Sequence, residues 1–436
     1  MMSLALLRDI GDIVLPISFV GILLAGIYLT FVTRFIQVRM VPRMIKMLWQ
    51  SFAGQNEQSS SNALPAHKAL FAAMSTTIGI GNIVGPAVAV RLGGPGALVG
   101  FLMATFFGAA MTYAEVTFAL HFRKKNADGS FSGGPMYFLR ESLGLLTARI
   151  YAVAGALLLA VWCSNQSNTL ADILCSYSIP KATTGFVIAV LVVTYLILGV
   201  KHIGNLAEKL VPTMFFLYCF AALWIIGMNV AQLPAIIKLV LQSAFSIKAF
   251  SGAAVGVMLR WGLAKGTQAC EAGIGTATIM HAQSENTSAV SQGILSMVSV
   301  YSVAFVCTLS ALVTLLTGTW NNQSVSLGIA MIAQPFEIYF FAGKIVLAVS
   351  AFLFGFGTIL GNAYNGSRCF DYLTRGSVIA LYGYYAIVAL VVFFGAILDV
   401  ELVWTISDFF IIPVALPNIA GILYLAIKRP ELLRTK

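Results

Sequence analysis

Residues 76–96 read TTIGIGNIVGPAVAVRLGGPG and lie in one of the most apolar parts of the chain. Glycine weakens a helix and proline removes a backbone hydrogen-bond donor, and this stretch is rich in both. They are Gly79, Gly81, Gly85, Gly93, Gly94, Gly96, Pro86 and Pro95. Unwound backbone at membrane depth persists only where protein or a polar cavity covers it. The stretch therefore predicts an interrupted membrane-spanning helix beside a binding site.

The composition is that of a membrane protein. Of the 436 residues, 59% are hydrophobic and only 10% are charged, whereas a soluble domain is about 25% charged. We therefore expect an all-α polytopic protein in contact with the lipid bilayer. The net charge of +10 is not arranged as a basic stripe with interleaved aromatics, so we expect no nucleic-acid partner. The six cysteines form no CxxC pair, which argues against a zinc site or a disulfide framework.

Eleven apolar segments are long enough to cross a bilayer, at about 20 residues for each span. They cover 13–32, 68–90, 96–120, 149–174, 182–200, 208–228, 250–281, 289–317, 340–362, 377–397 and 402–427. With the N-terminus placed outside, 18 lysines and arginines fall in inside connections and 5 in outside ones. Because positive charge favours the cytoplasmic side, we expect a multi-pass inner-membrane protein with its N-terminus outside and its C-terminus in the cytoplasm.

A second span is also interrupted by glycine, in RWGLAKGTQACEAGIGTAT at 260–278. It lies five spans after the first, so the two broken spans cross the membrane in opposite directions. This spacing predicts a 5+5 inverted repeat within a single transmembrane domain, 1–436. The first repeat covers 65–228 and the second 250–427, and 13–32 is an extra N-terminal helix. The alternative is that the glycines serve close helix packing, but two breaks at this spacing favour a binding site.

Paired interrupted helices are the sequence signal of a transporter site near the bilayer midplane. Half-helix N-termini offer N–H donors to a carboxylate, and freed carbonyls offer oxygen ligands to a small cation. Two other classes of protein fit less well. A membrane-embedded enzyme needs a polar catalytic set, and the four histidines have no such partners, so we expect no catalytic residues. A channel does not need opposed broken helices.

Several blocks of sequence resemble the alanine or glycine:cation symporters. They include GIGNIVGPAVAVRLGGPGA (79–97), CEAGIGTATIMHA (270–282) and TILGNAYNGSRCFDYL (358–373), and the likeness runs from span 2 to span 11. The resemblance implies a leucine-transporter-like fold. It also implies a protein that imports a small neutral amino acid together with a cation, usually sodium. It implies no other cofactor and no obligatory protein partner. The alternative within this class is proton coupling through Glu271, with a somewhat larger or polar substrate.

The resemblance also implies site residues. Substrate contacts fall on Gly79, Gly81, Asn82, Gln166, Cys270, Gly273, Thr358 and Asn362. Sodium ligands fall on the carbonyls near Ser75 and Ile78 and on the hydroxyl of Thr358.

This chain departs from the family pattern at the expected site. Ile80 replaces a threonine, Ala269-Cys270 replaces serine-asparagine, Gly357 replaces a threonine and Asn362 replaces a tryptophan. The lost hydroxyl at Gly357 predicts weak sodium dependence. The smaller Asn362 predicts a wider, more polar pocket that accepts serine or threonine.

Two ionisable residues, Lys265 and Glu271, lie inside the second interrupted span. Charged groups at membrane depth are costly and mark functional candidates. We expect these two to form a structural pair that fixes the unwound segment.

Overall fold

The computed structural model describes residues 4–53, 63–127, 129–245 and 253–435. In chain order its helices are α1 (Leu4–Val32), α2 (Ile36–Arg39), α3 (Val41–Ala53), α4 (Ala66–Thr77), α5 (Ile80–Gly93), α6 (Ala97–His121), α7 (Pro135–Ser142), α8 (Leu145–Cys175), α9 (Lys181–Leu198), α10 (Val200–Met228), α11 (Leu233–Phe245), α13 (Ala253–Cys270), α14 (Thr278–His281), α15 (Ala289–Leu316), α16 (Ala330–Tyr339), α17 (Gly343–Thr374), α18 (Val378–Gly395) and α19 (Val400–Lys428). Short 3-10 turns are η1 (Val230–Gln232), η2 (Thr319–Asn321) and η3 (Pro430–Leu433). The strands β1 (Lys124–Lys125) and β2 (Phe131–Ser132) pair antiparallel.

The prediction of an all-α polytopic membrane protein is confirmed. Within the described residues, nine helices are long and apolar enough to cross a membrane, and the bent pair α4 and α5 makes a tenth span. The predicted span 250–281 corresponds to α13 and α14, separated by an unwound segment. The predicted N-terminal helix is α1, which packs against α19, α6 and α13.

One predicted span ends much too early. The segment 340–362 is in fact α17, which continues to Thr374. The added residues, 363–374, include Asn365 and Ser367, which lower the hydropathy of this part although both are buried inside the protein. A hydropathy window cannot distinguish polar residues that face other helices from polar residues that end a span.

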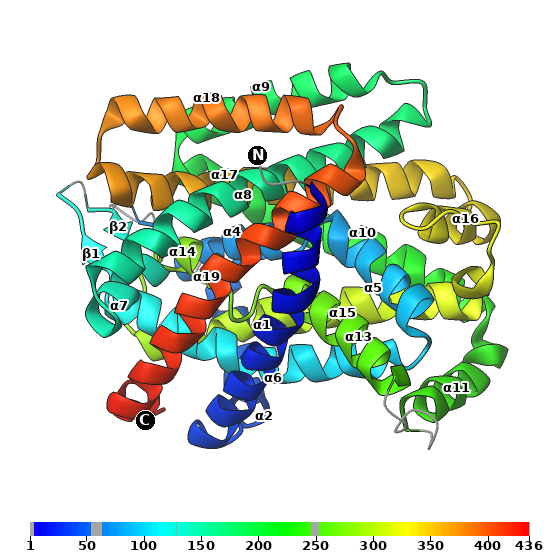
Figure 1. The fold of residues 1–436 in the computed structure, drawn as a ribbon, viewed down its shortest axis with the longest axis horizontal. Helices are drawn as coiled ribbons and strands as arrows, with labels where there is room; N and C mark the ends of the chain where they lie inside the picture. Colours follow the sequence, from blue (N-terminus) through cyan, green and yellow to red (C-terminus); the bar gives the residue numbers. More distant parts are fainter. Residues whose placement is uncertain (1–3, 54–62, 128, 246–252, 436) are drawn as a thin grey trace.

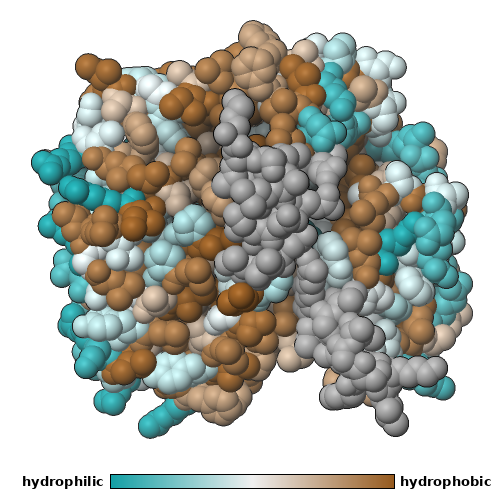
Figure 2. Space-filling view, viewed as in Figure 1, coloured by the Kyte–Doolittle hydropathy of each residue, from teal (hydrophilic) through white to brown (hydrophobic). Residues whose placement is uncertain are grey.

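Helices α8, α9, α17 and α18 run in roughly one direction, α1 and α19 cross in front of them, and small connecting elements lie at two opposite ends (Figure 1). The β1–β2 hairpin and α7 lie at one end, and α11 and α16 lie at the other. Among the coloured residues of the face shown in Figure 2, hydrophobic side chains predominate away from the margins, while hydrophilic ones gather toward the left and right margins. This distribution fits a bundle whose two polar ends project from a bilayer.

The core joins helices from the two halves of the chain. The helix α8 packs along α17, and α6 packs along both α15 and α13. Two glycines of α13 allow this helix to pack closely against α6. A Cβ on Gly262 would lie 2.3 Å from the carbonyl oxygen of Ala97, and one on Gly266 would lie 2.9 Å from that of Phe101. These two glycines therefore serve close packing, as small residues do in membrane helices.

Candidate functional site

The first break separates α4 from α5, whose axes differ by 45°. Gly79 precedes α5 in an extended conformation, and several polar contacts hold the opened backbone. The amide of Asn82 donates to the carbonyl of Thr77 at 2.7 Å, and the N–H of Ile80 donates to Oε1 of Gln166 at 3.1 Å. The start of α5 is therefore a helix N-terminus that lies inside the bundle, and a helix N-terminus carries partial positive charge.

The second break follows α13 and spans residues 271–277. Three residues here have positive φ angles: Glu271 at 53°, Gly273 at 82° and Gly275 at 83°. Glycine adopts this region freely, but glutamate does so at a cost. The Glu271 carboxylate accepts a hydrogen bond from the hydroxyl of Thr276, which ties together the two ends of the turn.

A cavity of about 600 Å³ lies between the two breaks, within the range of about 300–1,000 Å³ typical of small-molecule sites. Helices α4, α5, α8, α13, α17 and α19, the two breaks and the segment 326–330 at the start of α16 supply its walls. The lining residues are Thr76, Thr77, Gly79, Ile80, Gly81, Asn82, Val84, Gly85, Val88 and Leu92 of the first broken span; Trp162, Asn165, Gln166, Thr169 and Asp172 of α8; Trp261, Lys265, Gln268, Ala269 and Glu271 of the second; Ser326–Ala330; Thr358 and Asn362 of α17; and Trp404 and Ser407 of α19.

Most of the sequence-predicted substrate residues line this cavity. They are Gly79, Gly81, Asn82, Gln166, Thr358 and Asn362. Two others lie elsewhere. The Cys270 thiol donates to the carbonyl of Gly266 at 3.1 Å and faces α6. Gly273 faces Ile22 of α1. Ala269 and Glu271, the residues on either side of Cys270, line the cavity instead.

One face of α5 runs outward from the break along the cavity. Gly81, Gly85, Val88 and Leu92 all line it, and this spacing places them on one side of a helix. A Cβ on Gly81 would meet no atom within 4 Å. The N-terminal turn of α5 therefore presents bare backbone to whatever occupies the cavity, which is the arrangement that suits a carboxylate.

The three residues predicted to hold a cation lie together where α4 meets α17. The Thr358 hydroxyl lies 3.3 Å from the carbonyl oxygen of Ile78. A Cβ on Gly357 would lie 3.6 Å from Cβ of Ser75, so Ser75 faces the same turn of α17. Carbonyl and hydroxyl oxygens are the ligands that hard cations take in proteins. The residues present therefore fit a small alkali cation next to the cavity.

Sequence reasoning missed a polar cluster on the cavity wall. The ammonium of Lys265 donates to Oε1 of Gln268 at 3.1 Å and lies 5.0 Å from the centre of the Trp404 ring. The amide of Gln268 in turn donates to Asp408 of α19 at 3.3 Å. The expected pair of Lys265 with Glu271 is not formed, since the carboxylate of Glu271 is bonded to Thr276. The spacing of Lys265 and Gln268, three residues on one helix, was the available signal.

The cavity opens toward the end of the bundle that carries α16. Its walls include the exposed residues Leu92 and Leu327 there.

Several polar contacts join neighbouring elements on the side of the second break that faces away from this opening. Tyr151 donates to the carbonyl of Ile274 at 2.8 Å, and Asn365 donates to that of Thr276 at 3.1 Å. Asn418 donates to Glu115 at 2.6 Å.

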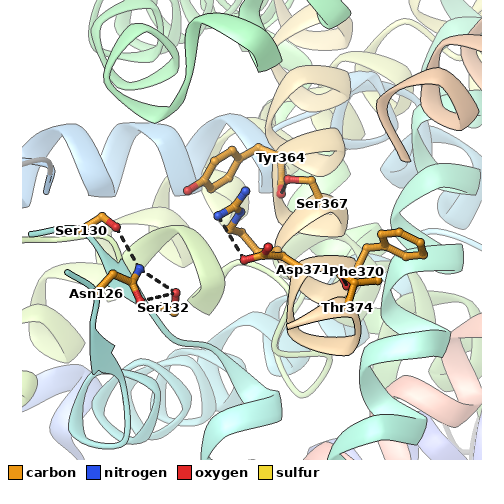
Figure 3. A network of polar contacts seen from close by, with 9 residues as sticks. Asn126, Ser130, Ser132, Tyr364, Ser367, Phe370, Asp371 and Thr374 are labelled. Atoms are coloured by element: carbon orange, nitrogen blue, oxygen red, sulfur yellow. Dashed lines mark hydrogen bonds and ion pairs between the residues drawn. The ribbon is translucent and has the colours of Figure 1, made fainter. Parts of the chain in front are cut away.

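The end of the bundle that carries the β hairpin is held by further polar contacts. Arg123 donates to the carbonyls of Ala282 and Asn286, at 3.0 and 2.8 Å. Burial lowers the pKa of Arg123 to about 10, so its guanidinium stays charged at neutral pH. Figure 3 shows Asn126 of the hairpin bonded to Ser130 and Ser132 across from the end of α17, where Asp371 lies.

The sequence model of the sodium:alanine symporter family matches residues 3–435. The chain belongs to that family. It is 32% identical over 422 residues to the sodium/alanine symporter AgcS of Methanococcus maripaludis, covering 94% of this chain and 92% of that protein. It is 30% identical over 422 residues to the probable sodium/glutamine symporter GlnT of Bacillus subtilis, covering 95% and 85% of the two chains.

Solved structures show the same fold at much lower identity. A Na+-coupled sialic acid symporter aligns with a TM-score of 0.58 at 12% identity, over 96% of this chain and 83% of that one. A manganese transporter of Eremococcus coleocola aligns with a TM-score of 0.54 at 13% identity, over 86% and 82%. The chain is therefore a multi-pass membrane transporter of a cation-coupled amino-acid symporter family and not an enzyme.

Proposed function

We propose that this protein imports a small neutral α-amino acid of the alanine or glycine type together with sodium, by alternating access to the cavity between the two breaks. The observation that carries the proposal is the bare N-terminal turn of α5 at Gly81, which faces the cavity beside the Ile78–Thr358 oxygen pair. The substrate carboxylate lies at this helix N-terminus, and sodium lies among the oxygens of Ser75, Ile78 and Thr358. Binding of both favours closure over the site.

The same proposal includes the orientation of the chain in the membrane and the residue ranges of its two repeats. The N-terminus is outside and the C-terminus is cytoplasmic, so the α16 end faces outward and the open cavity admits substrate from outside. The repeats cover 65–228 and 250–427. A proton-coupled mechanism is the second candidate, because Glu271 places a carboxylate on the cavity wall.

The test is uptake of radiolabelled alanine into proteoliposomes with imposed gradients. A sodium gradient alone should drive accumulation above equilibrium, and the recovered label should be unchanged alanine. Accumulation driven only by a proton gradient would instead support the Glu271 mechanism. Equilibration without accumulation would overturn symport altogether.

Replacing Gln166 should weaken substrate binding. Gln166→Ala removes the acceptor of the Ile80 N–H, and an unpaired buried donor costs about 1–3 kcal/mol. We expect the apparent affinity for alanine to fall by roughly one to two orders of magnitude. The measurement is the half-saturating alanine concentration in proteoliposomes. Gln323→Ala is the matched control, since Gln323 is an exposed acceptor of Arg91 outside the cavity. An unchanged affinity in Gln166→Ala would place Gln166 outside the site.

Asn362 should set the width of the pocket. It lines the cavity, it is 1% exposed and its amide oxygen has no hydrogen-bond partner within the described part of the chain. A substrate hydroxyl can supply the missing donor. We therefore expect serine and threonine to compete with labelled alanine at least as well as glycine does, and Asn362→Trp to narrow the range to alanine and glycine. Identical competition profiles for the two proteins would show that neighbouring side chains already fill the space.

A further inference from the structure

The glycine face of α5 leads from the first break to a positively charged side chain. Gly81 lies at the break, and Gly85 lies one turn farther along the same face, about 6 Å away along the helix axis. The stem of Lys265 lies against this second glycine, with its Cδ 4.0 Å from the position of a Gly85 Cβ. The path between the break and Lys265 carries no α5 side chain, so a ligand can occupy it.

Lys265 provides a positive charge, and its two direct side-chain contacts are neutral. Its ammonium bonds to the amide oxygen of Gln268 and lies over the Trp404 ring. Neither of these two side chains carries a negative charge, although Asp408, which accepts from the amide of Gln268, also interacts electrostatically with the ammonium. The bond to Gln268 uses one of the three ammonium donors. Among the described residues of the cavity wall, Lys265 is the one with a cationic side chain.

The two acidic side chains of the same wall have partners of their own. Asp172 lies at the mouth and pairs with Lys181. Glu271 accepts from Thr276 in the second break. Lys265 is half-buried, and an ammonium shielded in this way binds an anion more strongly than one in bulk water does.

We propose that Lys265 binds the side-chain carboxylate of an acidic amino acid whose α-carboxylate lies at the N-terminus of α5. The proposal rests on the function proposed above and extends its substrate range. The glycine face sets the length of the ligand. A ligand held at the first turn must reach about one helical turn to meet the ammonium, a distance that suits the two methylenes of glutamate better than the single methylene of aspartate.

The first experiment needs no variant. Glutamate and glutamine have nearly the same shape and differ in the charge of the side chain. Each is added to proteoliposomes that take up labelled alanine, and the concentration that halves uptake is measured. We expect L-glutamate to inhibit more strongly than L-glutamine. If glutamate does not inhibit while alanine is transported, the role of Lys265 is overturned and the proposed function stands. If no amino acid is transported or bound, the proposed function fails, and this extension fails with it.

The second experiment removes the charge. Lys265→Met keeps a long apolar stem, and we expect the preference for glutamate over glutamine to fall by roughly 10- to 100-fold. Lys265→Arg should retain most of the preference. Lys344→Met is the control and should leave the preference unchanged, because Lys344 is 62% exposed at the start of α17 and pairs with Glu337. An undiminished preference in Lys265→Met would overturn the proposal.

Discussion

We expect Gly81→Val to abolish amino-acid uptake in a protein that still inserts and folds. The position that a Cβ would take at Gly81 has no protein atom within 4 Å, because it faces the cavity. A valine therefore meets no clash with the protein and instead fills the space where a carboxylate would approach the backbone of α5. The expected loss of apparent affinity is at least about 100-fold, or about 2.8 kcal/mol.

The control for this variant is Gly383→Val on α18. Gly383 is also a helical glycine with no atom within 4 Å of its Cβ position, but it is exposed on the outside of the bundle. Both substitutions make the same change in intrinsic helix propensity, so the position of the new side chain in the cavity is what distinguishes them. Uptake should be lost in the first and kept in the second, with similar yields of monodisperse protein. Normal transport by Gly81→Val would mean that the ligand does not approach this turn.

The glycines of the two broken spans have different roles that sequence alone could not separate. Gly81 and Gly85 face the cavity, whereas Gly262 and Gly266 let α13 approach α6. Both uses produce the same small-residue signal in an apolar segment. The existence of two breaks was predictable, because glycine and proline act on the local backbone. The partner that each glycine faces depends on helices far away in the chain.

The same limit explains which candidate residues lie away from the cavity. Gly79, Gly81 and Asn82 of the first break line the cavity because they lie at the start of a regular helix. Cys270 is the last residue of α13, and Gly273 lies in the turn that follows, whose direction is set by three positive φ angles, one of them at Glu271. A glutamate in that conformation has no sequence signature. The contact between Gln268 and Asp408 joins residues 140 positions apart, which no local pattern predicts.

The second large effect is expected at Thr358, where the proposed substrate and cation sites meet. Its hydroxyl lies 3.3 Å from the carbonyl oxygen of Ile78, and Thr358 also lines the cavity. Valine has nearly the same shape as threonine but lacks the hydroxyl. The neighbouring Gly357 has no side chain that could replace the missing oxygen. We therefore expect Thr358→Val to raise the half-saturating sodium concentration for uptake by roughly 10- to 100-fold. This is the effect expected when a contact between a hydroxyl oxygen and a charged group, here the sodium ion, is lost.

Thr358→Ser restores the oxygen without the methyl group, so it should recover most of the sodium response. Thr194→Val is the control for the loss of a membrane-helix hydroxyl, because Thr194 is exposed on α9 and bonds to its own helix at Val190. The measurement is alanine uptake as a function of sodium, repeated with alanine varied at saturating sodium. If Thr358→Val changes only the alanine dependence, the hydroxyl contacts the substrate and the cation lies elsewhere. If neither dependence changes, the oxygen pair of Ile78 and Thr358 serves only to hold the opened helix against α17.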